Sequence, residues 1–411
     1  MTYDAENTQA GMLSEVLGFS QTVVEVGHTH PGVRRVLASA GGTVGFLVSL
    51  DDQRIMDLEV EIGLGHRGFE KEVESIPWHR ALPYVARLGH AGGMLAEIGF
   101  CLALEKLAGV SLPDRAIWLR TLAGELSRIA DHFSRLAAVS AAIGLRSAEG
   151  VAQQGEAAVM GVLRSATGGG VFAGWVQLGG VASSLPDGPN GFEEIWKASR
   201  SEIEKIISRF ETTAVHNPSC QKRLRDVAVL SADDCLAWGV TGPSIRAAGI
   251  PLDVRRDAPY LAYGSVDFDI PIGENGDDYD RLLIVVEEIR QSLRVVDQCE
   301  GLLTSLGPGA IRLAEPGWCD VEKENLDAYS ASVLDGPGIP SGEAAISIES
   351  STGELGFFLV CDEGALPRRI HCRGASFFHA QAMPAMLRGG QLEDLLPTAA
   401  ILHLISGECD R

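Results

Sequence analysis

Apolar positions in the middle of the chain follow the spacing of α-helices. Between residues 114 and 145 they recur every three or four positions, which places them on one face of a helix. Segments 81–110, 151–164 and 192–213 carry similar patterns and predict three further helices. Small residues are frequent in the first three of these four segments. We therefore expect close helix packing in a bundle that is buried on several sides.

Shorter apolar runs predict β-structure on either side of this helical region. Residues 45–50 and 54–62 form two such runs joined by a polar turn. A second hairpin is predicted between residues 344–348 and 356–360, and residues 370–373 are a candidate further strand. The β-structure is thus expected at both ends of the chain, outside the helical core.

The remaining segments predict a long loop and a second group of helices. Residues 168–191 are rich in Gly and Pro and predict a loop of a length that is often functional. Acidic residues open a helix predicted over 277–305, and a shorter helix is expected over 380–387, before an apolar tail. Residues 1–20 lack the pattern of a signal peptide, and we expect them to form a loose or partner-bound leader.

These elements together predict an α+β fold that is mainly α, with a central helical bundle and small peripheral β-structure. We expect an N-terminal leader and β-rich region over residues 1–65 and a helical core over 66–215. Residues 216–411 are expected to form a C-terminal α+β region. Because no segment has the composition of a linker, we expect the three parts to be intertwined as one unit.

The charge of the chain excludes several classes of partner. With 34 basic and 55 acidic residues the net charge is −21, which repels nucleic-acid phosphates and anionic lipid. No run of about 18 uncharged apolar residues is present, so no membrane span is expected. The sequence therefore favours a globular protein that binds no nucleic acid.

The cysteines and loop motifs argue against a cofactor held by this chain alone. Eight cysteines are scattered along the sequence without one C-x-x-C pair, which disfavours zinc and iron–sulfur sites. The phosphate-binding loop of nucleotide-binding proteins and the glycine fingerprint of dinucleotide-binding folds are also missing from the sequence. We expect no metal site here and no direct binding of NADH.

Two short histidine-containing segments are candidate functional sites. His28 and His30 would face the same side of a strand and could suit a metal, although a polar loop with one backbone-bonded imidazole explains them as well. The segment from His66 to Lys71 combines an imidazole, a guanidinium and a carboxylate. A solvated helix start is the alternative for this second segment.

A cationic group on the first predicted helix is the strongest site indication that the residues give by themselves. His79, Arg80, Arg87 and His90 interrupt an otherwise apolar segment, and Arg80, Tyr84 and Arg87 lie near one face. Charge on a buried helix needs either a partner or a wet cavity. Structural salt bridges are an equally good explanation of these residues.

Longer motifs along the chain resemble a known family. The sequences VGHTHP, EIGLGHRGFEK, RALPYVARL, RTLAGELSRIADH, TGPSIRAAGI, DFDIPIG and VEEIRQSLR, with the terminal GECDR, resemble the 49-kDa, or D, subunit of respiratory complex I. The resemblance spans roughly residues 23–411. It implies the fold that this protein shares with the large subunit of nickel–iron hydrogenases.

The resemblance also implies a function and a set of partners. In complex I this protein lies in the peripheral arm, on the cytoplasmic side of the cell membrane in bacteria. It packs against a small subunit that carries an iron–sulfur cluster, and a quinone headgroup enters between the two. The other implied partners are a C-type subunit and the membrane arm. Of the four nickel-binding cysteines of the hydrogenases, only one has a counterpart here, Cys409 in the tail, and one thiolate cannot replace four.

Several positions depart from the pattern of the family. Gly27, His30 and Pro31 match its N-terminal motif, but Arg34 stands where a second histidine belongs. His90 replaces the tyrosine that follows the Arg-Leu-Asp sequence of the family. That histidine and that tyrosine are the family's proposed quinone ligands. We therefore predict that Arg34 and His90 line the acceptor site, with His30 and Arg67 nearby.

Further departures leave the precise activity open. Ala142 occupies the place of an aspartate of the family, and residues 171–175 replace a histidine-containing loop. The main hypothesis is a subunit of an NADH-quinone oxidoreductase. The alternatives are a subunit of a ferredoxin-linked or hydrogenase-related complex, and a scaffold subunit that has lost the quinone chemistry.

Overall fold

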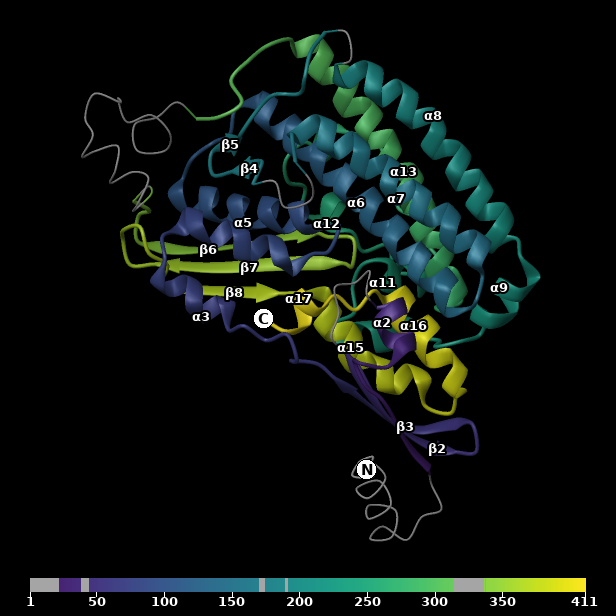
Figure 1. Ribbon diagram of the computed structural model, residues 1–411. Coiled ribbons are helices and arrows are strands. Elements are labelled where there is room, and N and C mark those ends of the chain that lie inside the picture. The colour runs from purple at the N-terminus through teal and green to yellow at the C-terminus, as the bar shows by residue number, and fades with distance from the viewer. Residues whose placement is uncertain (1–21, 38–43, 170–173, 189–190, 314–335, 337) are drawn as a thin grey trace, which may run out of the picture.

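The structure is a computed structural model in which the elements lie around a central helical bundle (Figure 1). It describes residues 22–37, 44–169, 174–188, 191–313, 336 and 338–411. The leader expected at residues 1–20 lies outside these ranges, as does most of the segment 171–175. None of the helices in the described part is long and apolar enough to cross a bilayer.

The central helix of the bundle is α6 (Asp114–Ala142), and the sequence pattern predicted it correctly. It packs against α7 (Arg146–Thr167) and α13 (Asp278–Leu306), and α7 in turn packs against α8 (Phe192–Phe210) (Figure 1). Every residue of α6 from 119 to 140 is buried. A helix surrounded in this way needs small residues at its contacts. Gly155 of α7 shows this, because a Cβ there would lie 2.5 Å from the ring of Phe133.

A three-stranded antiparallel sheet covers one side of the bundle. It has the order β6 (Gly342–Glu349), β7 (Glu354–Cys361) and β8 (Arg369–Arg373), which confirms the hairpin and the further strand expected from the sequence. Helix α5 (Gly93–Ala108) packs on this sheet (Figure 1). Phe357 fills the space left by Gly99 of α5, where a Cβ would lie 2.7 Å from the ring.

A second antiparallel sheet contains the first described residues. Strands β1 (Thr22–Val26), β2 (Gly45–Asp51) and β3 (Arg54–Glu61) pair in chain order, and helix α15 (Ala375–Leu387) packs against β3. The observed strands confirm the hairpin expected near the N-terminus. The fold is therefore α+β and mainly α, as predicted. The division at residues 65 and 215 stays a prediction.

The helix predicted over residues 81–110 is wrong in its first half. The chain instead forms three short helical turns, η3 (Trp78–Ala81), α4 (Leu82–Val85) and η4 (Ala86–Leu88). Helix α5 begins only at Gly93. The chain turns sharply at Gly89, where a Cβ would lie 2.6 Å from the backbone nitrogen of Gly93. Only glycine fits such a close backbone approach without strain. This break places His90 in a non-helical turn.

Smaller elements connect these layers. One of them, α2 (Pro31–Val36), was not expected from the sequence, and a two-residue pair, β4 (Val176–Gln177) with β5 (Gly180–Val181), interrupts the predicted loop. The remaining elements are α3 (Phe69–Glu72), η2 (Val73–Ser75), η5 (Glu211–Val215), α9 (Pro218–Leu224), α10 (Ala232–Trp238), α11 (Pro243–Ala247), α12 (Val254–Asp257), η6 (Tyr263–Ser265), η7 (Leu392–Asp394), α16 (Leu395–Leu402) and α17 (Ser406–Cys409).

Candidate functional site

The C-terminal tail folds back onto the turns that precede α5. Gly407 of α17 lies against the backbone of η4, where an added Cβ would overlap with the carbonyl oxygen of Arg87. Asp410 anchors the end of the tail. Its Oδ1 accepts a hydrogen bond of 2.6 Å from the amide of Gly63, and its Oδ2 accepts one of 2.7 Å from the amide of Gly65. Three segments far apart in the sequence therefore meet at one place.

A small polar pocket of about 190 Å³, the tail pocket, opens where these segments meet. Its side-chain lining consists of Arg67, Arg87, Ser406 and Asp410. Both arginines are exposed, whereas Asp410 is buried. The pocket thus combines two cationic side chains with one anchored carboxylate.

Behind the tail, Asp131 of α6 is the centre of a fully buried polar cluster. Its Oδ2 accepts a hydrogen bond of 2.9 Å from Nε2 of His403 and a second, short one from the hydroxyl of Ser351, and its Oδ1 accepts one from the amide of Gly92. Burial opposes its ionisation, but His403 and these hydrogen bonds outweigh burial and hold the pKa of Asp131 well below its usual range. The imidazole of His90 lies near this carboxylate and also acts to lower the pKa of Asp131.

The tip of the β6–β7 hairpin links this cluster to the tail. Thr352 donates a hydrogen bond of 2.8 Å to Oε1 of Glu408, and the amide of Ser376 donates one of 2.7 Å to Oε2 of the same carboxyl. Burial raises the pKa of Glu408 above its ordinary value. Beside it, Arg135 donates to the carbonyl oxygen of Ser351 over 2.6 Å. The hairpin tip is therefore held between α6 and the tail by buried polar contacts.

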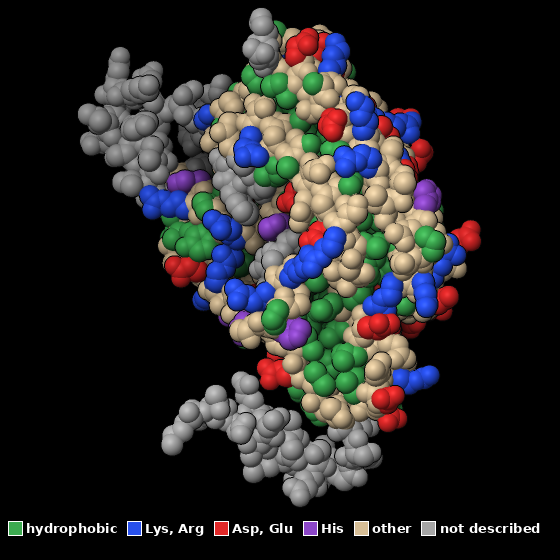
Figure 2. All heavy atoms as spheres, turned by 45° about the vertical axis from the view of Figure 1, so that its right-hand side comes forward, with side chains coloured by type: hydrophobic (Ala, Val, Ile, Leu, Met, Phe, Trp, Pro, Cys, Tyr) green, Lys and Arg blue, Asp and Glu red, His purple; other side chains and the backbone are tan. Residues whose placement is uncertain are grey.

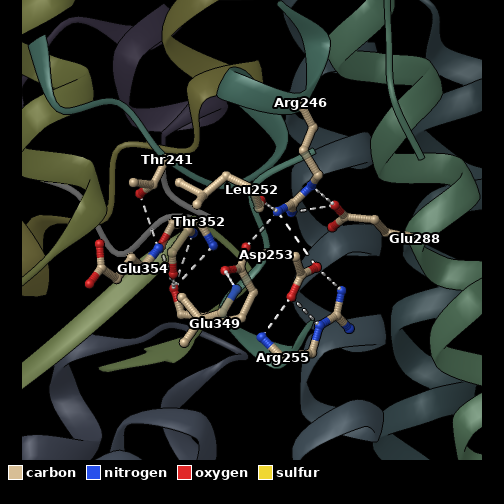
Figure 3. Close-up of polar contacts among 12 residues, drawn as sticks. Thr241, Arg246, Leu252, Asp253, Arg255, Glu288, Glu349, Thr352 and Glu354 are labelled. Atoms are coloured by element: carbon tan, nitrogen blue, oxygen red, sulfur yellow. Dashed lines mark hydrogen bonds and ion pairs between the residues drawn. The ribbon is translucent and has the colours of Figure 1, made fainter. Parts of the chain in front are cut away.

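A second buried network joins α11, α12, α13 and the end of β6 (Figure 3), and it reaches α6 through Glu125 and Arg128. Arg246 contacts Glu288 at 2.5 Å and Glu349 at 2.8 Å, and Arg255 contacts Asp253 at 2.7 Å. Arg255 also bridges to Glu125, which Arg128 contacts as well. A buried charge is tolerated only when it is paired and hydrogen-bonded, and every member of this network meets that condition.

Four acids and three arginines make up this second network, so one acid can be neutral without loss of charge balance. Burial raises the pKa of Glu349 to about 7, while Arg246 and other cations act against that rise. His132, which contacts Glu288 at 2.9 Å, is buried beside Arg135 and has its pKa lowered to about 4. We interpret this network as a structural core that fixes the elements around the polar cluster at Asp131.

The structure separates the four candidate residues into different surroundings. His90 is half-buried next to Asp131 and His403, and Arg67 lines the tail pocket. Arg34 is exposed on α2, without an ion pair to any described residue. His30 caps the same helix, with its Nδ1 accepting from the amide of Gly32 over 3.2 Å. That Arg34 and His90 line one cavity stays a prediction.

Two expectations from the sequence can be compared with these placements. His28 and His30 lie in a turn rather than on a strand, and the described residues contain no cluster of three or more potential metal ligands. Arg80 and Arg87 lie on exposed turns rather than on a buried helix. The expectation that a buried helix carries these charges is wrong, because α5 begins only at Gly93, after the turn at Gly89, and Arg80 and Arg87 precede that turn.

Comparison with known proteins identifies the family. A family model described as the 49-kDa subunit of respiratory-chain NADH dehydrogenase matches residues 150–411. The chain belongs to this family. It is 34% identical over 95% of its length to the D subunit of the NADH-quinone oxidoreductase of Pelobacter propionicus, covering 96% of that protein. It is also 32% identical over 95% of its length to the corresponding D protein of Myxococcus xanthus, of which it covers 92%.

Some members of the family are longer proteins. The chain is 33% identical over 94% of its length to the C/D subunit of the NADH-quinone oxidoreductase of Nitrosospira multiformis, but it covers only 63% of that protein. The name of that relative joins a C part and a D part in one polypeptide. The present chain corresponds in length to the D proteins.

Sequence reasoning missed the cluster at Asp131. Asp131 stands in the middle of α6 near Arg128, His132 and Arg135, and a group of charged residues on a helix with many apolar positions is a signal for a buried polar site. His403 has a left-handed backbone with φ of 56°, which is uncommon for a residue other than glycine. No spacing rule joins the two, because 272 residues separate them along the chain.

Proposed function

We propose that the chain is a peripheral-arm subunit of an NADH-quinone oxidoreductase and that quinone is reduced beside it. Membership of the 49-kDa family over nearly the whole chain is the observation that carries this proposal. The electrons would come from an iron–sulfur cluster held by a neighbouring small subunit. This chain would supply residues that bind and orient the quinone headgroup, and the assembly would translocate ions through its membrane arm.

His90 is the proposed headgroup ligand with the best support. It projects from the glycine turn before α5, and its imidazole is half-buried next to an ionised carboxylate. Such a ring can donate a hydrogen bond to a quinone oxygen, as the phenol of a tyrosine would. The carboxylate of Asp131, which accepts hydrogen bonds from His403 and Ser351, would lie behind the ring.

Arg34 is proposed as the second headgroup ligand, with His30 and Arg67 nearby. Its helix, α2, packs against α6 and α16. Those are the helices that carry Asp131 and directly precede His403. A permanent guanidinium at this position would donate to a quinone oxygen and stabilise the negative charge that develops on reduction.

The exposure of Arg34 also favours a second candidate function. A ligand residue is expected to be partly enclosed, whereas Arg34 is exposed and has no ion-pair partner in the described part of the chain. A scaffold protein would keep the fold and the contacts to the C-type and iron–sulfur subunits but would not contribute to quinone reduction. In the first proposal, the neighbouring small subunit would enclose Arg34.

Purification of the native assembly tests the proposal. A tagged copy of the chain should be recovered from the membrane fraction, on its cytoplasmic side, together with C-type, iron–sulfur and membrane subunits. The assembly should oxidise NADH with quinone as acceptor. An assembly that accepts electrons only from ferredoxin, or that contains no iron–sulfur partner, would contradict the proposal.

A further inference from the structure

A groove of about 370 Å³, the α13 groove, opens where residues 271–275 pass the first turns of α13. Its apolar wall consists of Pro271, Ile272, Leu283 and Ile284. Ile272 is 50% exposed and Leu283 is 37% exposed, and Leu283 is the one exposed residue between positions 276 and 286. Because both side chains line the same groove, they form a local apolar surface rather than two scattered exposed residues.

The walls of this groove are held in place by hydrogen bonds within the chain. Oδ2 of Asp280 accepts hydrogen bonds from the amides of Glu274 and Asn275, at 2.9 Å and 2.7 Å. The amide of Gly273 donates to the carbonyl oxygen of Arg246 over 2.9 Å. The segment would have to break these hydrogen bonds to move onto α13, so the groove is already formed in the chain by itself.

The polar part of the lining carries charge of one sign. It consists of Glu274, Asp280 and Glu287, with no basic side chain. Glu274 is exposed, and no described residue forms an ion pair with its carboxylate. Arg290 contacts Glu287 at 3.5 Å, but it also contacts Glu211 at 2.7 Å. Elsewhere the charges are mixed, since Figure 2 shows Asp and Glu side chains interspersed with Lys and Arg over much of one face. The groove therefore favours a cationic group.

This combination of an apolar wall and an acidic rim matches one half of a protein–protein interface. At such interfaces a large apolar side chain of one protein fills a preformed pocket of the other, and charged groups surround the contact. In the proposed function the chain works within an assembly of subunits, and the present inference rests on that part of the proposal. A second copy of the chain is a poor occupant, because its net charge of −21 would repel an acidic groove.

We infer that the α13 groove docks a segment of a neighbouring subunit that inserts a large apolar side chain between Ile272 and Leu283 and carries a Lys or Arg beside it. The inserted side chain would remove both apolar side chains from water. The cation would pair with Glu274 at the rim and fix the orientation of the docked segment.

Photo-cross-linking in the purified assembly tests this inference. Leu283 is replaced by the photo-reactive amino acid p-benzoylphenylalanine, and the linked peptides are identified by mass spectrometry. We expect a link to one partner subunit, at a peptide with a Lys or Arg close to the linked residue. The same replacement at Leu306 is the matched control, because Leu306 is 48% exposed at the other end of α13 and does not line the groove. It should not link to that peptide.

Charge reversal tests the cationic part of the docked segment. In the chain that carries the photo-reactive residue at position 283, Glu274→Lys should lower the yield of the link several-fold. Glu202→Lys is the control, since Glu202 is exposed on α8 outside the groove, and it should leave the yield unchanged. Equal yields in the two variants would overturn the inference.

Three results of the cross-linking itself would also overturn the inference. They are a link to no partner subunit, a link to a second copy of the chain, and a link to a peptide without a basic residue nearby. If partner subunits are recovered but position 283 links to none of them, only this inference fails. If no partner subunit is recovered at all, the proposed function fails and the inference falls with it.

Discussion

Glu97 of α5 gives a sharp test of the buried electrostatics. Its side chain is 2% exposed, and its Oε2 has no hydrogen-bond partner in the described structure. Burial raises the pKa of this carboxyl from 4.5 to about 8. The folded protein therefore holds a proton on Glu97 at neutral pH, while the unfolded chain has released it.

The pKa difference sets the size and the sign of the effect on stability. Between pH 4.5 and about pH 8 the folded state binds one proton more than the unfolded state, so this group makes the protein less stable as pH rises. Each pH unit in this window costs about 1.4 kcal/mol, and the whole window costs roughly 5 kcal/mol. Above pH 8 the full cost remains but no longer grows.

The substitution Glu97→Gln removes the titration while keeping the shape of the side chain. Burial of the amide adds a cost that does not vary with pH, so the comparison concerns the slope of unfolding free energy against pH. Urea unfolding of both proteins at several pH values from 5 to 9 measures it. We expect the variant to gain about 4 kcal/mol relative to the original chain between pH 5 and pH 8.

Other titrating groups do not obscure this comparison, because they are the same in both proteins. Glu202→Gln is the matched control, since Glu202 is an exposed helical carboxylate on α8. Its stability profile should run parallel to that of the original chain. Parallel profiles for Glu97→Gln as well would refute the reasoning, because Glu97 would then be ionised in the folded protein.

Three further predictions concern the buried network, the tail and metal content. In urea unfolding, Arg246→Met should cost roughly 3–5 kcal/mol of unfolding free energy, because it leaves buried carboxylates without their cation. Arg388→Met is the control. It removes the exposed ion pair of Arg388 with Asp57 and should cost less than about 1 kcal/mol. Gly407→Ala should release the tail from Arg87, seen as faster proteolysis at the C-terminus, and unchanged proteolysis would contradict the tight contact. Elemental analysis of the purified chain should find no stoichiometric nickel, zinc or iron, because the sequence has no paired cysteines. A stoichiometric metal would contradict the expectation that this chain holds no metal site.

Local patterns predicted most of the fold. The spacing of apolar residues gave α6 and α13 within a few residues of their ends, and the two hairpins were found from short apolar runs and their turns. The break before α5 was missed because it depends on a backbone contact between Gly89 and Gly93. Helix α2 was missed because its six residues are too few for a periodic pattern.

The candidate site could be predicted only in part, because its contacts are tertiary. The sequence directed attention to His90 and Arg67, and these residues do lie beside the polar cluster and the tail pocket. It gave no sign that Asp131 would meet His403 or that Asp410 would bind the amides near Arg67. Such pairs form only after the tail has folded back across α6 and the turns before α5.

The most direct test of the central claim is the quinone reductase rate of the assembled complex with His90 replaced. His90→Phe keeps a planar ring but removes the hydrogen bond, so we expect the rate with quinone to fall by at least about tenfold, the equivalent of about 1.4 kcal/mol. His90→Tyr should retain most of the rate, and NADH oxidation with an artificial acceptor should be unchanged in both variants. A quinone reductase rate that is indifferent to His90→Phe and to Arg34→Ala would contradict the proposed redox role of this site.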